Sequence, residues 1–191
     1  MFHPRSFLFV LAALSTALVA QDFGPVIKVA TQAFPDKPHF GVVCDYSRNR
    51  TAVNDMIHAL PEGTRLTVVD VRNPDLVGAA GSILVLRSVD LLGLLPNDPL
   101  FSDGKPHATR LINMVQTFNP TILAFGNSPS ALQNGCAFAV GEKTGWKLLV
   151  NPGDPRIKGV IENITIEPMD PKPSRTARLN PVTVQVVSLA R

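Results

Sequence analysis

Apolar residues along the chain follow two patterns that alternate. One is a short continuous apolar run that ends in a polar turn, as in a strand buried on both faces. The other places apolar residues three and four apart, as on one face of a helix. We expect strands at 40–45, 66–71, 90–95, 120–125 and 136–140, and helices at 50–60, 74–88, 106–118 and just before 134. The alternation predicts an α/β fold: a three-layer sandwich around a mainly parallel five-stranded sheet, with a C-terminal β-rich tail.

Three stretches fit more than one element. Asn73 and Pro74 form a good helix start, and a helix from there to 88 places the next strand at the expected interval. The segment 81–87 could instead be a strand in its own right. The stretches 26–33 and 146–150 each suit a short strand or the start of a helix. We favour the helix over 74–88 and leave the other two stretches open.

The two ends of the chain differ in character from its middle. Arg5 gives a positive start, 6–19 is apolar, and Ala17 and Ala20 are small residues suited to a cleavage site. This indicates a signal peptide and a periplasmic protein. The alternative is an uncleaved membrane anchor, but the apolar run is shorter than the ~20 residues that span a bilayer. We divide the chain into a signal peptide (1–20), an N-terminal extension (21–37), an α/β domain (38–150) and a Pro-rich β tail (151–191). In the tail, 159–167 and 182–189 could pair as a hairpin.

Composition and motifs exclude several classes of function. The 191 residues carry a formal net charge of only +3, with no basic stripe, so no nucleic-acid partner is expected. No glycine-rich phosphate loop, dinucleotide fingerprint or nucleophile elbow occurs, so we assign no catalytic residue, no enzyme activity and no cofactor. Cys44 and Cys136 are either two buried thiols or one disulfide. With four scattered histidines, they show no metal-ligand spacing.

The turns that follow the predicted strands are the candidate binding residues. In a parallel sheet, ligands bind outside the carboxyl ends of the strands, near the point where the strand order reverses. These turns are short, polar or glycine-containing, and could offer backbone amides and carboxylates to a small molecule. The expected ligand-binding residues are Asp45, Tyr46, Ser47, Asn97, Asp98, Gly126, Asn127 and Ser128. Asp45 and Asp98 could share one face as a carboxylate pair, although Asp is also common where strands simply end in turns.

Three stretches together resemble a known family. Asp90-Leu-Leu-Gly-Leu-Leu-Pro-Asn-Asp-Pro, Pro120-Thr-Ile-Leu-Ala-Phe-Gly-Asn-Ser and Gly135-Cys-Ala-Phe-Ala-Val look like the second lobe of the ABC-transporter substrate-binding family of the periplasmic-binding-protein type. The resemblance covers about 38–150 and implies a single lobe whose sheet has flavodoxin-like strand order. It also implies binding of a small organic ligand, such as an amino acid, for a transporter permease or a sensor. That family closes two lobes over its solute, whereas this chain holds about one. A homodimer facing across its switch-point edges could supply the second lobe.

The same region is also similar to small periplasmic regulators that restrain membrane-bound diguanylate cyclases. Those proteins are secreted, single-domain and α/β, which fits the length of this chain. Their aromatic-rich N-terminal helix is not evident here. This second resemblance implies an alternative function, a regulatory or interaction protein that acts on a membrane-bound signalling partner.

Overall fold

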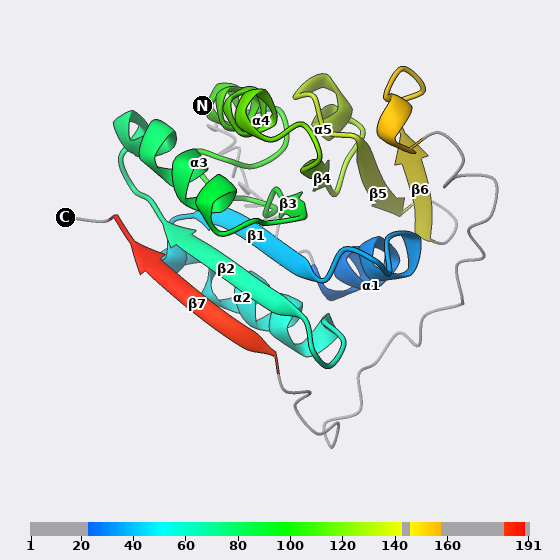
Figure 1. The fold of residues 1–191 in the computed structure, drawn as a ribbon, viewed down its shortest axis with the longest axis horizontal. Coiled ribbons are helices and arrows are strands. Elements are labelled where there is room, and N and C mark those ends of the chain that lie inside the picture. Colours follow the sequence, from blue (N-terminus) through cyan, green and yellow to red (C-terminus); the bar gives the residue numbers. More distant parts are fainter. Residues whose placement is uncertain (1–22, 143–145, 158–181, 190–191) are drawn as a thin grey trace, which may run out of the picture.

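A computed structural model describes residues 23–142, 146–157 and 182–189 of the chain (Figure 1). The expected signal peptide and the tail segment 159–167 lie outside the described residues. The described residues form one sheet of seven strands in the order β6-β5-β4-β3-β1-β2-β7. The strands are β1 (His39–Cys44), β2 (Arg65–Asp70), β3 (Leu91–Gly93), β4 (Leu123–Gly126), β5 (Phe138–Glu142), β6 (Trp146–Val150) and β7 (Thr183–Ser188).

The first five strands run parallel in the flavodoxin-like order 2-1-3-4-5, which confirms the predicted fold class. The predicted number of five strands is wrong, because each edge of the sheet gains one. β6 pairs antiparallel with β5, so the stretch 146–150 is a strand. β7 pairs in parallel with β2 over its whole length, so this tail segment extends the main sheet (Figure 1). The sheet therefore includes Thr183–Ser188 of the expected tail.

Helices cover both faces of the sheet. Figure 1 shows α3 and α4 side by side on one face and α2 behind the sheet on the other. The helices are α1 (Gly24–Ala33), α2 (Tyr46–Ala59), α3 (Val77–Leu86), α4 (Pro106–Phe118) and α5 (Ser130–Gln133), with 3-10 turns η1 (Pro74–Leu76) and η2 (Pro155–Ile157). The predicted bounds of the helix 106–118 are confirmed. The stretch 81–87 lies largely within α3, as favoured. The three-layer arrangement is confirmed.

The layer on the side of α1 and α2 is built on aromatic side chains. The rings of Phe125 and Phe138 stack with centroids 5.2 Å apart, and Phe34 stacks on Phe138 at 4.9 Å. Phe40 meets Phe125 edge-on at 6.2 Å. Phe23, just before α1, is fully buried in the same cluster. The segment before the first strand, expected to be an extension, is thus a helix whose apolar residues are part of the core.

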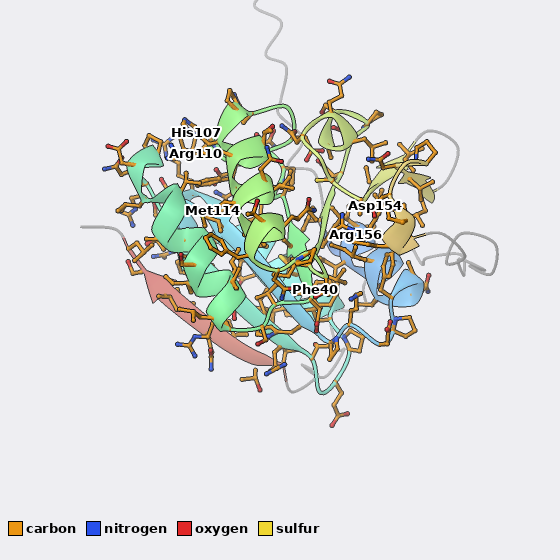
Figure 2. The ribbon with its side chains drawn as sticks, turned by 45° about the horizontal axis from the view of Figure 1, so that its top comes forward. Phe40, His107, Arg110, Met114, Asp154 and Arg156 are labelled. Atoms are coloured by element: carbon orange, nitrogen blue, oxygen red, sulfur yellow. The ribbon has the colours of Figure 1, made fainter. Side chains whose placement is uncertain are left out.

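The opposite layer depends on a close contact between α3 and α4. A side chain at Gly81 would collide with the Met114 side chain, since a Cβ there would lie 2.1 Å from its Cε. Figure 2 shows Met114 on α4, with Arg110 and His107 one and two turns earlier on the same helix. Leu111, Ile112 and Val115 of α4 are buried beneath. Gly81 therefore allows the two helices to pack closely over the sheet.

The η2 turn is tied to the sheet by one arginine. Arg156 donates from Nη1 to the carbonyl oxygens of Pro120 at 2.8 Å and Ile122 at 3.0 Å, next to the start of β4. Its Nε donates to Asp154 at 2.8 Å, and the two side chains form an ion pair (Figure 2). The first residues of the expected tail are thereby held against the domain.

Cys44 and Cys136 are free and buried, which decides between the two alternatives left open by the sequence. Cys44 belongs to the core layer under α1 and α2, and Cys136 to the layer under α3 and α4. Burial raises the pKa of both thiols. Within the part of the chain that the structure describes, no helix has the length and apolar character needed to cross a membrane.

Candidate functional site

The turns predicted to bind a ligand lie at one edge of the sheet. β3 lies beside both β1 and β4, and all three strands are parallel, so the turns that follow them leave the sheet at the same edge. The chain goes from β1 to β2 on one side and reaches β3 on the other, which makes the gap between β1 and β3 the topological switch point. We call the turns at this edge the carboxyl rim, meaning residues 45–50, 70–73, 94–103 and 126–130.

Asp98 is the most enclosed polar residue of the carboxyl rim, only 1% exposed. One carboxylate oxygen accepts the backbone N–H groups of Leu100 at 2.9 Å and Phe101 at 2.8 Å. The other accepts the backbone N–H of Asp45 at 3.0 Å and the side-chain amide of Asn49 at 2.7 Å. Burial raises the pKa of Asp98, and these four hydrogen bonds oppose that rise. The carboxylate thus joins the turn after β3 to the start of α2.

Asp45 caps α2 and holds two arginines near the switch point. Its Oδ1 accepts the backbone N–H of Ser47 at 3.1 Å and the Ser47 hydroxyl at 2.6 Å. Its carboxylate oxygens lie 3.4 Å from Nε of Arg48 and 3.5 Å from Nε of Arg72. The Ser47 hydroxyl, and then the Arg72 charge, lower the pKa of Asp45 despite its burial. This carboxylate is therefore ionised at neutral pH and forms only loose ion pairs.

Asp70, at the end of β2, is a rim carboxylate that the sequence reasoning did not select. It accepts the backbone N–H of Tyr46 at 3.0 Å and lies 3.5 Å from Nη2 of Arg72. The hydroxyl of Ser188 on β7 donates to it at 3.3 Å. The guanidinium of Arg72 thus lies between two carboxylates while its side chain stays 53% exposed. The position of Asp70 at the end of an apolar strand, like that of Asp45, was the signal available in the sequence.

The turn after β4 is organised by a second residue missed from the sequence, Asp103. Its Oδ2 accepts the backbone N–H of Asn127 at 3.0 Å and the hydroxyl of Ser128 at 2.8 Å. Its Oδ1 is buried without a hydrogen-bond partner among the described residues, and burial raises the pKa of Asp103. A Cβ at Gly126 would lie 2.3 Å from Oδ1 of Asp103. Gly126 is therefore required for the carboxylate to approach the strand end.

The eight predicted residues thus form two groups on one rim. Asp45, Tyr46, Ser47, Asn97 and Asp98 lie around the switch point, and Gly126, Asn127 and Ser128 lie around Asp103. Among the described residues, no hydrogen bond or ion pair links the two groups directly. Ser47 and Asn97 are exposed, and Tyr46 and Ser128 are partly exposed. Asp45, Asp98, Gly126 and Asn127 are buried, so they shape the rim from beneath.

The rim offers charges of both signs. The exposed side chains of Arg48 and Arg72 face the loosely paired Asp45, and Arg50 lies over the Tyr46 ring at 5.9 Å. The described residues contain no group of three or more His, Cys, Asp or Glu side chains placed to hold a metal ion. What the arrangement can do chemically is bind a small molecule through arginine donors, an ionised carboxylate and the Ser47 hydroxyl.

Comparisons with known proteins give a distant structural likeness. No protein-family model matches the chain, and no curated protein matches it in sequence. Among solved structures, a protein from Streptococcus pneumonia described as the ABC domain in complex with L-Trp is similar, with 12% sequence identity and a TM-score of 0.47. The match covers 64% of this chain and 40% of that one. The ligand named in that description belongs to that protein, and a likeness at this level assigns no family to this chain.

Proposed function

We propose that the carboxyl rim binds a small zwitterionic organic molecule, such as an amino acid, and performs no chemistry on it. The observation that carries this proposal is the parallel arrangement of β1, β3 and β4, which collects their terminal turns at the β1–β3 switch point. Small molecules bind at this position in open α/β sheets. The buried Asp98 fixes the rim by joining two of its turns, so the site is preformed.

The charges of the rim favour a ligand that carries both signs. Arg48 and Arg72 are more than half exposed, and their contacts to Asp45 are 3.4 and 3.5 Å long. A ligand carboxylate can therefore take hydrogen bonds from the exposed faces of these guanidinium groups. The ligand's ammonium group would be attracted to Asp45, whose lowered pKa keeps it ionised at neutral pH. A purely anionic or cationic molecule would satisfy only half of this arrangement.

The proposed setting is the periplasm, with the chain delivering its ligand to an ABC-transporter permease or a sensor. This rests on the signal-peptide pattern of residues 1–20 and on the family resemblance over 38–150. A single rim leaves much of a ligand exposed, whereas good pockets bury 70–90% of one. A homodimer that brings two rims together would supply the missing cover.

A calorimetric and thermal-shift screen of the twenty amino acids tests the proposal, with the mature chain, residues 21–191, as the protein. A ligand at a hundred times its Kd should stabilise the protein by about 2.7 kcal/mol. Arg72→Gln should weaken binding about tenfold or more, because it removes a charge-assisted contact. Arg110→Gln, on the surface of α4, is the matched control and should bind normally. The proposal fails if no amino acid binds, or if both variants lose affinity equally.

A second function, a regulatory protein for a membrane-bound signalling partner, is favoured by a different observation. Leu86 at the end of α3 is 82% exposed and Phe118 at the end of α4 is 69% exposed. Both side chains are large and apolar, and both stand at the end of a helix where another protein could cover them. The test is binding to the purified periplasmic part of a membrane-bound cyclase, with Leu86→Ser and Phe118→Ser expected to abolish it. Unchanged binding of both variants would remove this support.

A further inference from the structure

A small hollow lies where the parallel strands begin, at the end of the sheet opposite the carboxyl rim. Its volume is about 110 Å³, and its walls come from the first residues of β1 and β2, from β7 and from the end of α3. The main polar side chains that line it are Arg65, Thr67, Arg87, Thr183, Gln185 and His39. We call it the amino-edge hollow. It shares no residue with the carboxyl rim, so it requires an explanation of its own.

The positive charges of the amino-edge hollow have no counter-charge. Arg87 donates from Nη1 to Oε1 of Gln185 at 2.9 Å, and this is a neutral partner. The Arg65 side chain has no hydrogen-bond or ion-pair partner among the described residues, and no carboxylate lines the hollow. By contrast, Arg48, Arg72 and Arg156 each pair with an aspartate. Two arginines with nothing negative between them leave a positive potential in the hollow.

Two neutral side chains of the hollow, Gln185 and Thr183, keep donors that are not used elsewhere. The Oε1 of Gln185 is occupied by Arg87, which leaves the amide N–H₂ of that side chain to donate. The Thr183 hydroxyl has no partner among the described residues and can also donate. His39 is only 3% exposed and lies between two fixed partners, with Nδ1 3.1 Å from the Ser88 carbonyl and Nε2 2.9 Å from Oγ1 of Thr67. Its Nδ1 therefore carries the hydrogen and its Nε2 accepts from Thr67.

One carboxylate lies near the hollow without lining it. Oδ2 of Asp90 accepts the backbone N–H of His39 at 3.0 Å. That contact is on the backbone of β1, away from the Arg65 and Arg87 side chains that form the walls. A single nearby carboxylate cannot neutralise two arginines, so the local charge stays positive even with a neutral His39.

The size of the hollow limits what it can hold. A volume of about 110 Å³ can hold a few water molecules, since each water occupies roughly 30 Å³. Sites for whole organic ligands are larger, at about 300 Å³ or more. We propose that the amino-edge hollow binds a phosphate-sized oxyanion between the guanidinium groups of Arg65 and Arg87. Such an ion would link the start of β2 to the end of α3 and would hold β7 against the sheet through Gln185 and Thr183.

The proposal is tested by titrating inorganic phosphate into the ¹⁵N-labelled mature chain at constant ionic strength, with chloride as the balancing anion. Saturable amide shifts should appear at His39, Thr67, Arg87 and Gln185, and not at the carboxyl rim. Arg87→Gln and Arg65→Gln should each weaken phosphate binding about tenfold. Both arginines are exposed, so the variants should fold. Arg110→Gln, at another exposed arginine on α4, is the control and should bind phosphate as the parent does.

A second arm separates two sources of the same chemistry. If methyl phosphate binds as well as inorganic phosphate, the hollow accepts a phosphate group carried on a larger molecule; if only inorganic phosphate binds, the free ion is the ligand. The proposal is overturned if phosphate causes no saturable shifts around the hollow through the millimolar range. It is also overturned if Arg110→Gln weakens binding as much as Arg87→Gln does.

Discussion

The two ends of the parallel sheet use the same residue types in opposite ways. At the carboxyl rim, Asp45 and Asp70 neutralise Arg48 and Arg72, and a buried Asp98 fixes the loops beneath them. At the amino edge, Arg65 and Arg87 have no carboxylate partner and lie beside a buried histidine. The sheet therefore presents a charge-balanced surface at one end and a positively charged hollow at the other. A zwitterion suits the first, and an oxyanion suits the second.

The largest effect is expected where the carboxyl rim depends on a single carboxylate. Asp98→Ala removes the acceptor of four hydrogen bonds. The backbone N–H groups of Asp45, Leu100 and Phe101 lose this acceptor, whereas the Asn49 amide keeps its bond to the Asp45 carbonyl. The free energy of unfolding should fall by about 3 kcal/mol or more, measured by urea denaturation. Asp98→Asn should cost less, because the amide oxygen still accepts. Asp36→Ala, at an exposed position, is the control. An equal loss in the free energy of unfolding there would show that the hydrogen bonds of Asp98 do not stabilise the fold.

A second effect concerns the turn after β4. Gly126→Ala would place a methyl group 2.3 Å from Asp103 Oδ1 and 2.5 Å from the Ala131 Cβ. The expected loss is about 1–3 kcal/mol in the free energy of unfolding, typical of an overpacked site. Gly78→Ala is the matched control, because a Cβ there meets nothing within 4 Å and alanine favours the helix. Thermal denaturation should show the first variant destabilised and the second slightly stabilised; the reverse order would contradict the described geometry.

Buried His39 makes stability depend on pH at the amino edge. Burial, and then the charge of Arg65, lower the pKa of His39 below its ordinary value of 6.5, while Asp90 and the Ser88 carbonyl act in the opposite direction. The unfolded chain thus binds this proton more readily than the folded one. The contribution of neutral His39 to the free energy of unfolding is fully present above pH 6.5. It is lost as the pH falls from 6.5 towards the lowered pKa of the folded protein. In this range the free energy of unfolding should fall by at most about 1.4 kcal/mol per pH unit.

The measurement is urea denaturation at several pH values between neutrality and mild acid. His39→Gln should remove most of the slope, whatever its effect on stability at pH 7. His58→Gln, at an exposed position on α2, should keep the slope of the parent protein. A slope that persists in His39→Gln would show that another group controls this transition.

Two residues with left-handed backbone give the smallest expected effect, one at each end of the sheet. Ser88, with φ of 54°, follows the end of α3, and Asn97, with φ of 62°, lies in the turn after β3. Val89 and Ser88 donate backbone N–H groups to Leu84 and Val85, which is the usual hydrogen-bonding of a helix end that favours glycine. Asparagine adopts this conformation readily, and serine less so.

Ser88→Gly should therefore stabilise the protein by up to about 1 kcal/mol, while Asn97→Gly should change stability by less. Calorimetric melting temperatures of the two variants provide the comparison. If Asn97→Gly is the more stabilising of the two, the backbone at the carboxyl rim is under more strain than its hydrogen bonds indicate.

The sequence predicted most of the sheet because its central strands are continuously apolar. The runs at 40–45 and 66–71 correspond to β1 and β2 within one residue, and the helical spacing of 106–118 gives α4. Parallel strands that end in polar turns then placed Asp45, Asn97 and Ser128 at one edge. Local pattern and topology rules were sufficient for these features.

The remaining features depend on contacts between distant segments. The alternating residues of β7 fit a hairpin as well as an added parallel strand, and only pairing with β2 distinguishes these arrangements. The amino-edge hollow brings together Arg65, Arg87 and Gln185 from three separate segments, none of which carries a motif. Asp103 lies in a loop, and its importance depends on the absence of a side chain at Gly126. No spacing rule connects such residues in advance.

The most direct test of the central claim, that the carboxyl rim is the ligand site, is a residue-resolved NMR titration of the protein with its best-binding amino acid. The account predicts that saturable amide shifts concentrate at 45–48, 70–73 and 97–98, with Arg65 and Arg87 unaffected. Saturable shifts confined to the amino edge, or to the exposed ends of α3 and α4 around Leu86 and Phe118, would contradict it.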